Sequence, residues 1–440
     1  MTIKKETLNT WYSRLIDEED DARVCKDIPK SSCTNIPVNF FLIIVTQLMT
    51  KLADSLANAK TVLPWLLTAT GAPAGLTALL VPIRESGSLI PQLLIGGYIR
   101  RYAIRKYFFV FGCIAQAICL VSMLLCSIYL EGVMGGIAII ASLIMFSLAR
   151  GICSIASKDV IGKTIPKTRR GTQTGISTSL SGIITMGVAI AMILGLMSNS
   201  NHFAILLLAA AVCWVIGALF YAQVQEARGA TSGSENGIKH ALGRLSLLKT
   251  DKPFRKFVIM RALLMSSGLA APFFVTLTMS QENIPQGIQL GLFVGLSGLA
   301  SMVSGHIWGK WSDKNSLLVM TIAGFSCALI CIIAIVGMLL NITYIDILAL
   351  VLFFLLMVSH QGVRVGRKTY LIDLATGNKR TDYTAVGNSL IGVLLLGAGL
   401  ITMLIAQFST LLVFAFFALC CVLAGLLGIK EQLQGNNAAD

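Results

Sequence analysis

The sequence predicts an all-α membrane protein with twelve transmembrane helices, arranged as two pseudo-symmetric bundles of six. Three observations predict this fold class. Apolar residues make up 55% and charged residues only 13% of the chain, whereas a soluble domain carries about 25% charged residues. Twelve apolar runs are each long enough to cross a bilayer. The two halves of the chain also align with each other at polar as well as apolar positions.

The connections between the apolar runs predict the topology. Odd-numbered connections, such as 68–75 and 131–136, hold almost no lysine or arginine, whereas even-numbered ones, such as 100–107 and 163–171, are basic. Basic loops stay in the cytoplasm, so both termini are expected there. The predicted spans are 38–62, 76–98, 107–129, 133–156, 173–197, 202–224, 257–279, 286–308, 317–340, 344–366, 385–406 and 409–429.

The longest polar connection divides the spans into two sets. A bundle over 38–224 and a second over 257–429 are expected, joined by a cytoplasmic linker at 225–256. Residues 1–37 are polar and acidic, so a cytoplasmic segment without a signal peptide is predicted there, and 430–440 is expected to be a cytoplasmic tail.

The two halves contain an internal repeat. Residues 157–182 align with 367–392 at a constant shift of 210, so that Lys158 meets Lys368 and Arg170 meets Arg380. Because the matches include polar loop positions, duplication is favoured over chance similarity between apolar helices. Parallel six-helix repeats are typical of transporters with a site near the middle of the membrane.

The loop after the second span carries a family resemblance. GYIRRYAIRK (97–106) resembles the signature Gly-x-x-x-Asp-Arg-x-Gly-Arg-Lys of the major facilitator superfamily, and the likeness extends over about 38–429. Arg105 and Lys106 fit the signature, but Arg101 stands where it has Asp. The resemblance implies a secondary transporter that works by alternating access as a monomer. Similarity to bacterial permeases of the superfamily implies the bacterial inner membrane.

The second half and the fourth span extend this resemblance. GKWSDKNS (309–316) keeps an Asp at 313 followed by a Lys at 314, which implies that Asp313 takes the role of steadying the outward-facing state. Arg150 fits the pattern of the family's fourth helix. The predicted gating residues at the cytoplasmic side are Arg101, Arg105, Asp313, Lys314, Arg367, Lys368 and Asp373.

Charged side chains inside the apolar runs indicate the substrate. Each such charge costs about 2.5–3.5 kcal/mol to insert, so it is expected to face a cavity or a partner. The cations are Lys51, Lys60, Arg84, Arg150, Arg261 and Arg364, and the acids are Asp54 and Glu85. The positive excess favours an anion, and arginine forks suit carboxylates. A small organic anion, such as a citrate-type metabolite or a carboxylate siderophore, is therefore predicted to bind Arg84, Arg150, Arg364, Lys51 and Lys60.

The two acids are candidates for proton coupling. A carboxyl group removed from water holds a proton more tightly, so Asp54 and Glu85 are predicted to carry the coupling proton. Lys51 lies three residues before Asp54 and is expected to pair with it. Arg84 and Glu85 diverge by about 100° on their helix, so Glu85 is expected to meet Lys60. The alternative is that Arg84 and Glu85 form structural ion pairs without substrate contact.

Other functions stay open or are excluded. The alternatives are a proton-driven exporter of amphipathic or cationic compounds, bound by Asp54 and Glu85, and a non-transporting membrane sensor. The fifth span has no proline, so it lacks the Gly-Pro motif of the drug/proton antiporter branches. His306 and His360 are expected to be packed polar residues, with a proton relay as the alternative. The sequence contains no HExxH, GxSxG or Walker motif, and no enzyme, cofactor, bound metal or nucleic-acid partner is expected.

Overall fold

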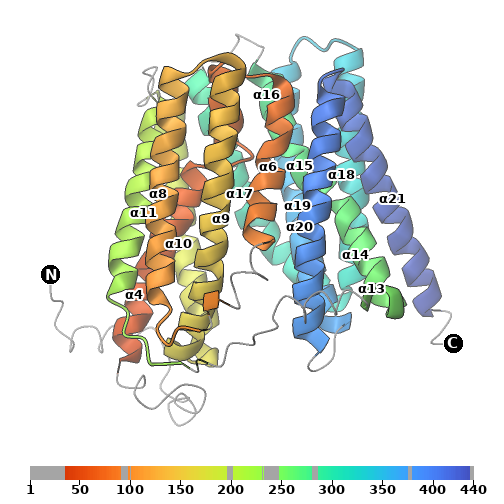
Figure 1. The fold of residues 1–440 in the computed structure, drawn as a ribbon. Helices are drawn as coiled ribbons and strands as arrows, with labels where there is room; N and C mark the ends of the chain where they lie inside the picture. Colours follow the sequence, from red (N-terminus) through yellow and green to blue (C-terminus); the bar gives the residue numbers. More distant parts are fainter. Residues whose placement is uncertain are drawn as a thin grey trace.

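The structure is a computed structural model that describes residues 35–90, 98–99, 101–195, 202–229, 231, 247–279, 286–374 and 379–436. Every regular element in these residues is a helix, which confirms the predicted fold class (Figure 1). The first half contains α4 (Ile36–Leu56), α5 (Val62–Ala69), α6 (Ala74–Leu89), α8 (Lys106–Tyr129), α9 (Gly132–Thr164), α10 (Lys167–Ile193) and α11 (His202–Ala222). The second contains α13 (Leu247–Thr250), α14 (Lys252–Leu264), α15 (Ser266–Leu269), α16 (Ala271–Met279), α17 (Gln286–Lys314), α18 (Ser316–Leu339), α19 (Ile345–Leu374), α20 (Lys379–Ala406) and α21 (Thr410–Asn436).

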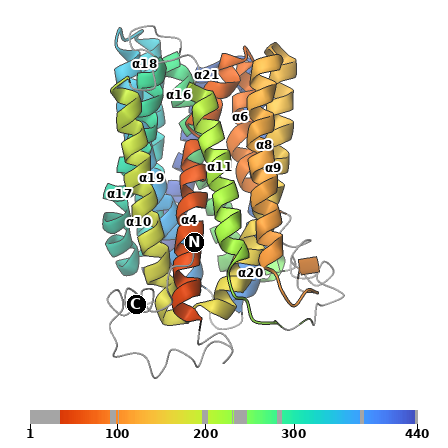
Figure 2. The ribbon, with the colours of Figure 1, turned by 90° about the vertical axis from the view of Figure 1, so that its left-hand side faces the viewer.

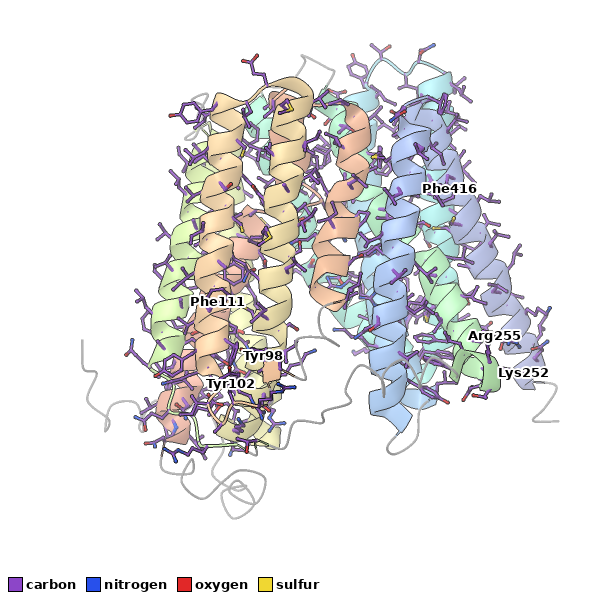
Figure 3. The ribbon with its side chains drawn as sticks, in the orientation of Figure 1. Tyr98, Tyr102, Phe111, Lys252, Arg255 and Phe416 are labelled. Atoms are coloured by element: carbon purple, nitrogen blue, oxygen red, sulfur yellow. The ribbon has the colours of Figure 1, made fainter. Side chains whose placement is uncertain are left out.

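The helices account for the twelve predicted spans. Ten stretches in the described part of the chain are long and apolar enough to cross a membrane, and α17 contains a shorter apolar stretch, Ile288–Ser304. The remaining span corresponds to α6. Large apolar side chains such as Phe111, which is 62% exposed on α8, point outward as a lipid-facing surface requires (Figure 3).

The first and seventh spans are interrupted, which the apolar pattern of the sequence does not predict. The expected continuous helix over 38–62 is wrong, because α4 ends at Leu56 and α5 begins at Val62. Asn58 organises the break: its side-chain oxygen accepts the backbone N–H of Lys60 at 2.8 Å, and its carbonyl accepts the N–H of Val62 at 2.9 Å. The span expected at 257–279 begins earlier and consists of α14, α15 and α16.

Two polar caps hold helix ends in the second half. Asp251 caps α14 by accepting the backbone N–H of Phe254 at 3.0 Å, and Asn315 caps α18 by accepting that of Leu318 at 2.9 Å. Tyr383 at the start of α20 donates its hydroxyl to Asp251, and its ring lies 4.3 Å from that of Phe254. Burial and the bond to Asp251 raise the pKa of Tyr383 to about 12, so the hydroxyl stays a donor at neutral pH.

The helices form two bundles that meet along a seam. In the first bundle α4 packs on α10 and α11, while α8 and α9 pack on each other; in the second α18 packs on α19 and α21. The bundles meet where α6 packs on α20, α10 on α17 and α5 on α16 (Figures 1 and 2). We call the side where α4 begins and α21 ends the terminal side, and the side where α8 meets α9 the far side (Figure 1).

The seam is closed on the far side. Every residue of α5 from 62 to 67 and every residue of α16 from 271 to 275 is buried, and these two helices pack on each other. By contrast, Arg364 and Lys368, on the part of α19 toward the terminal side, are exposed. These exposed charged side chains therefore lie on the side opposite the packed α5 and α16.

The α6–α20 contact depends on a glycine. A Cβ added to Gly399 would lie 2.4 Å from Cγ of Pro82, whose ring cannot turn away. Gly399→Ala is therefore expected to separate α6 from α20 and to lower the free energy of unfolding by about 1–3 kcal/mol, measured by thermal unfolding of the purified protein. Gly397→Ala is the matched control, because no atom lies within 4 Å of its added Cβ. Equal melting temperatures for the two variants would contradict this role of Gly399.

Candidate functional site

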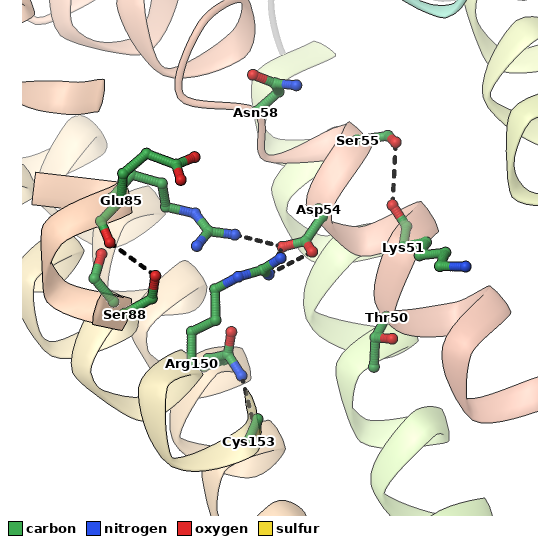
Figure 4. Close-up of polar contacts among 12 residues, drawn as sticks. Thr50, Lys51, Asp54, Ser55, Asn58, Glu85, Ser88, Arg150 and Cys153 are labelled. Atoms are coloured by element: carbon green, nitrogen blue, oxygen red, sulfur yellow. Dashed lines mark hydrogen bonds and ion pairs between the residues drawn. The ribbon is translucent and has the colours of Figure 1, made fainter. Parts of the chain in front are cut away.

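One carboxylate in the first bundle binds two arginines. Asp54 of α4 accepts a bond at 2.6 Å from Nη2 of Arg84 on α6, and both of its oxygens accept bonds from Nη1 of Arg150 on α9 (Figure 4). Three helices that are distant in sequence thus converge on Asp54. With one acid against two guanidinium groups, the cluster keeps an excess positive charge.

The two arginines differ in their freedom to move. The guanidinium carbon of Arg84 lies 4.9 Å from the ring centroid of Phe146, and the side chain is only 12% exposed. A cation over an aromatic ring gains further electrostatic stabilisation, so Arg84 is held in place. The side chain of Arg150 is 33% exposed, which leaves it accessible to an entering ligand.

Lys51 does not pair with Asp54, so that expectation is wrong. Its Nζ donates to Ser177 at 2.8 Å and to Thr178 at 2.5 Å, both on α10. The hydroxyl of Ser177 in turn donates to Oε1 of Gln47 at 2.9 Å. Figure 4 shows the Lys51 side chain directed away from Asp54. The lysine therefore connects α4 to α10, and it would have to leave these hydroxyls to reach a substrate at Asp54.

The second bundle repeats the contact of Lys51. Arg261 of α14 donates to Oδ1 of Asn388 on α20 at 3.0 Å. A shift of 210 residues relates Arg261 to Lys51 and Asn388 to Thr178, so the two contacts occupy equivalent positions. Arg261 is 7% exposed, and its Nε has no hydrogen-bond partner among the described residues.

Lys60 connects the two bundles. It lies in the break between α4 and α5, and its Nζ is 2.9 Å from Nε2 of His360 on α19. Nδ1 of His360 is 2.9 Å from the hydroxyl of Ser267 on α15. The expected ion pair of Lys60 with Glu85 is absent among the described contacts, although the charge of Lys60 acts on the Glu85 carboxylate.

Glu85 and the charged residues of α19 remain accessible. Glu85 is exposed, and its carboxylate has no hydrogen bond or salt bridge to any described residue. The positive charges of Lys60, Arg84, Arg150 and Arg367 act on it. Arg364 is also exposed, and its charge acts on Lys60 and His360. The described residues contain no group of three or more His, Cys, Asp or Glu side chains placed to hold a metal ion.

The loops at the terminal side form a separate charged network. Arg105 donates to Asp159 of α9, and Lys163 lies 2.6 Å from Asp159 and 3.0 Å from Glu226. Glu226 also accepts the backbone N–H groups of Arg105 and Lys106 at 2.8 Å, which caps the start of α8.

Of this network, Arg105 was predicted from the sequence, but the two acids were not. Asp159 lies just after the predicted fourth span, and Glu226 lies in the predicted linker. The basic loop itself could have indicated them, because a cluster of basic residues needs acids close to it. Of the other expected gating residues, Arg101, Lys314 and Lys368 are exposed and Arg367 is partly buried, while the side chains of Asp313 and Asp373 lie outside the described residues.

The comparison with known sequences gives one family. Residues 40–393 match the family described as Major Facilitator Superfamily. A search of curated proteins gives no match.

Solved structures give the same fold. A D-xylose–proton symporter has a TM-score of 0.68 at 12% identity, with 88% of this chain and 96% of that chain covered. A mutant of the nucleoside transporter NupG has a TM-score of 0.69 at 13% identity, with 89% and 99% covered. A bacterial homologue of the iron transporter ferroportin in its inward-facing state has a TM-score of 0.66 at 16% identity, with 89% and 98% covered. Its outward-facing state has a lower TM-score of 0.56.

Proposed function

The chain belongs to the Major Facilitator Superfamily, a family of transporters rather than enzymes, and on this premise we propose that it is a proton-coupled secondary transporter of a small organic anion. The observation that carries the proposal is the binding of one carboxylate, Asp54, by the two arginines Arg84 and Arg150. A site that binds an internal carboxylate in this way has the charge and the fork geometry to bind a carboxylate of a substrate.

In this proposal Asp54 occupies the place of the substrate until the substrate arrives. An incoming carboxylate competes for Arg84 and Arg150 and displaces Asp54. Two guanidinium groups would then face two carboxylates, and the net positive charge of the empty site would be lost. If Asp54 takes up a proton as it is displaced, the net charge of the site is unchanged. One proton is therefore expected to travel with each substrate carboxylate that binds there.

The second bundle supplies further cations for a substrate with more than one anionic group. Arg364 is exposed on α19, and Arg367 lies one turn nearer the terminal side. Their charges act on Lys60 and His360 at the seam. A substrate bridging these residues and the Arg84–Arg150 pair would contact both bundles, which favours a di- or tricarboxylate, including a carboxylate siderophore. We place Lys60 in the same set and Glu85 beside Asp54 as a second proton acceptor.

The proposal assigns the terminal side to the cytoplasm. The basic loops support this assignment through the positive-inside rule, since Arg101, Arg105 and Lys163 all lie on that side. The closed far side and the higher TM-score with the inward-facing ferroportin homologue agree with an inward-facing state.

A thermal-shift screen of the purified protein tests the substrate class. Citrate, malate, succinate and inorganic phosphate would be compared with the lipophilic cation tetraphenylphosphonium. An anion at about 100 times its Kd is expected to stabilise the wild type by about 2.7 kcal/mol, seen as a higher Tm. Arg84→Ala should abolish this shift, whereas Arg101→Ala, in an exposed loop, should keep it. Anion shifts of equal size in both variants would contradict the assignment of Arg84.

One observation favours a second function. Glu85 is an exposed carboxylate without a hydrogen-bond or ion-pair partner among the described residues, as an exporter of cationic compounds would require. Stabilisation by the cation alone, lost in Glu85→Gln, would establish this alternative in place of anion transport.

A further inference from the structure

The hydrogen bonds around His360 determine where its proton lies. The hydroxyl of Ser267 donates to the carbonyl oxygen of Leu264 at 2.7 Å, so toward His360 the hydroxyl acts as an acceptor. Nδ1 of His360 must then carry a hydrogen, and in the neutral ring Nε2 is left with a lone pair. Lys60 is a donor without acceptor capacity in its charged form, and its Nζ lies 2.9 Å from Nε2. The contact is therefore complete only while Nε2 is unprotonated.

We propose that His360 is a proton-binding site, and that Lys60 and His360 form a latch that closes the far side and opens when Nε2 is protonated. The proposal deepens the proposed function only in its proton coupling and does not depend on the identity of the substrate. A proton on Nε2 would place an imidazolium against an ammonium group. The bond would be replaced by repulsion between two like charges.

The charged groups around the latch determine where Lys60 moves once Nε2 is protonated. The described charges that act on the His360 ring are those of Lys60, Arg364 and Arg367, all of them cations, and α15 contributes the neutral Ser267. The acid whose charge acts on Lys60 is Glu85 of α6. Glu85 has no hydrogen-bonded partner among the described residues, so it is available to receive Lys60 when the latch opens. Lys60 would then exchange a contact between bundles for one within its own bundle.

The position of the latch connects it to the closure of the seam. Lys60 lies in the break just before α5, and Ser267 lies in α15, just before α16. The helices α5 and α16 are the two that pack together on the far side. The latch thus joins the interruptions of the first and seventh spans at the point where each leads into the closed segment. Releasing it frees α5 to separate from α16.

The internal repeat shows what is special about His360. A shift of 210 residues relates His360 to Arg150. In the first bundle Arg150 binds the acid of its own bundle, Asp54. In the second bundle the position equivalent to Asp54 is Leu264, and His360 bonds across the seam instead. A permanently charged residue has thus been replaced by one that titrates near neutral pH in water.

The test is the distance between the bundles on the far side as a function of pH. Glu131 and Tyr344 are both exposed at that side and would be replaced by spin-labelled unnatural amino acids. Double electron–electron resonance would then measure the distance between the labels in the absence of any anionic substrate. The three cations around His360 oppose a proton on Nε2, so the response is expected below the ordinary titration range of a histidine. Between about pH 8 and about pH 4.5, the ratio of long to short distances in the wild type should rise about tenfold.

Two variants should lose this pH response, one because its far side stays closed and the other because its far side is already open at pH 8. In His360→Gln, the amide oxygen can still accept a hydrogen bond from Lys60, but the side chain binds no proton. Short distances between the two labels should therefore persist at every pH. Lys60→Met removes the latch, so long distances should already be enriched about tenfold at pH 8. His202→Gln, at the start of α11, and Lys430→Met, exposed on α21, are the controls and should behave as wild type.

A wild-type pH response in His360→Gln, or short distances throughout in Lys60→Met, would overturn the proposal. Gel filtration and Tm identify a misfolded variant, and His360→Asn then replaces His360→Gln with the same expectation. The measurement uses no anion and leaves Asp54 and Arg84 intact. Failure of the latch and failure of the anion site are therefore separate results.

Discussion

Asp54→Asn is expected to bind the anionic substrate about ten- to a hundredfold more tightly than the wild type and to lose uphill uptake. In the wild type the Asp54 carboxylate occupies Arg84 and Arg150, and a substrate carboxylate must displace it. Asparagine keeps the size of the side chain but removes the competing charge, and each tenfold gain corresponds to about 1.4 kcal/mol. The amide also accepts no proton, so substrate binding no longer takes one up at this site.

Three measurements on proteoliposomes separate these effects. Equilibrium binding should show the higher affinity, counterflow of labelled substrate should persist, and accumulation against a gradient driven by an imposed pH difference should disappear. Glu131→Gln, in the exposed connection between α8 and α9, is the control and should resemble the wild type in all three. Weaker anion binding by Asp54→Asn would show that Asp54 holds the arginines in place for the substrate instead of competing with it. Full uphill uptake would exclude Asp54 as the proton carrier.

The charges of this site could be predicted from the sequence, but their partners could not. Asp54, Arg84 and Arg150 each stood out because a charge inside an apolar run needs a partner or a cavity. Spacing along α4 suggested Lys51 as the partner of Asp54, and this was wrong. Three residues turn a helix by about 300°, which leaves the two side chains about 60° apart. In the structure, Lys51 donates to hydroxyls of α10, and Asp54 forms ion pairs with arginines of α6 and α9. The partner of each charged residue is therefore determined by how distant segments of the chain pack together.

The repeat carried more geometric information than the apolar pattern did. The alignment at a shift of 210 residues reaches the fifth and eleventh spans. The same shift relates Lys51 to Arg261, and each of these binds its fifth or eleventh span at an equivalent residue. The apolar pattern, in contrast, gave one continuous first helix and hid the break that holds Lys60. An apolar run predicts that a segment can lie in a membrane. It does not report whether the backbone stays helical throughout.

Glu226 shows why a contact between loops is hard to recognise from the loop's own residues. It lies just beyond α11, in a segment that reads as a polar linker, yet its side chain is fully buried. Its partners come from the loop before α8 and from α9, which are distant in sequence. The basic residues of the predicted loop were the sign that such an acid had to exist.

Glu226→Ala is expected to lower the free energy of unfolding by about 3–5 kcal/mol, the effect of removing one member of a buried ion pair. The substitution leaves the ammonium of Lys163 without its second acid and the backbone N–H groups of Arg105 and Lys106 without an acceptor. Glu226→Gln retains one acceptor oxygen and should lie between the alanine variant and the wild type. Thermal unfolding of the purified protein measures all three.

The matched control for Glu226 is an acid in an exposed ion pair. Glu431 lies 2.5 Å from Lys256, whose side chain is 40% exposed, so water screens this pair. Glu431→Ala should cost no more than about 1 kcal/mol. Both variants remove one carboxylate from a lysine, so the difference between them reports the burial of Glu226 together with its cap on α8. If Glu226→Ala melts at the temperature of Glu431→Ala, the cap on α8 contributes nothing beyond a surface ion pair. A large difference would show that the loop before α8 stabilises the first bundle on the terminal side. The acid that holds this loop, Glu226, lies just beyond α11, the last helix of the bundle.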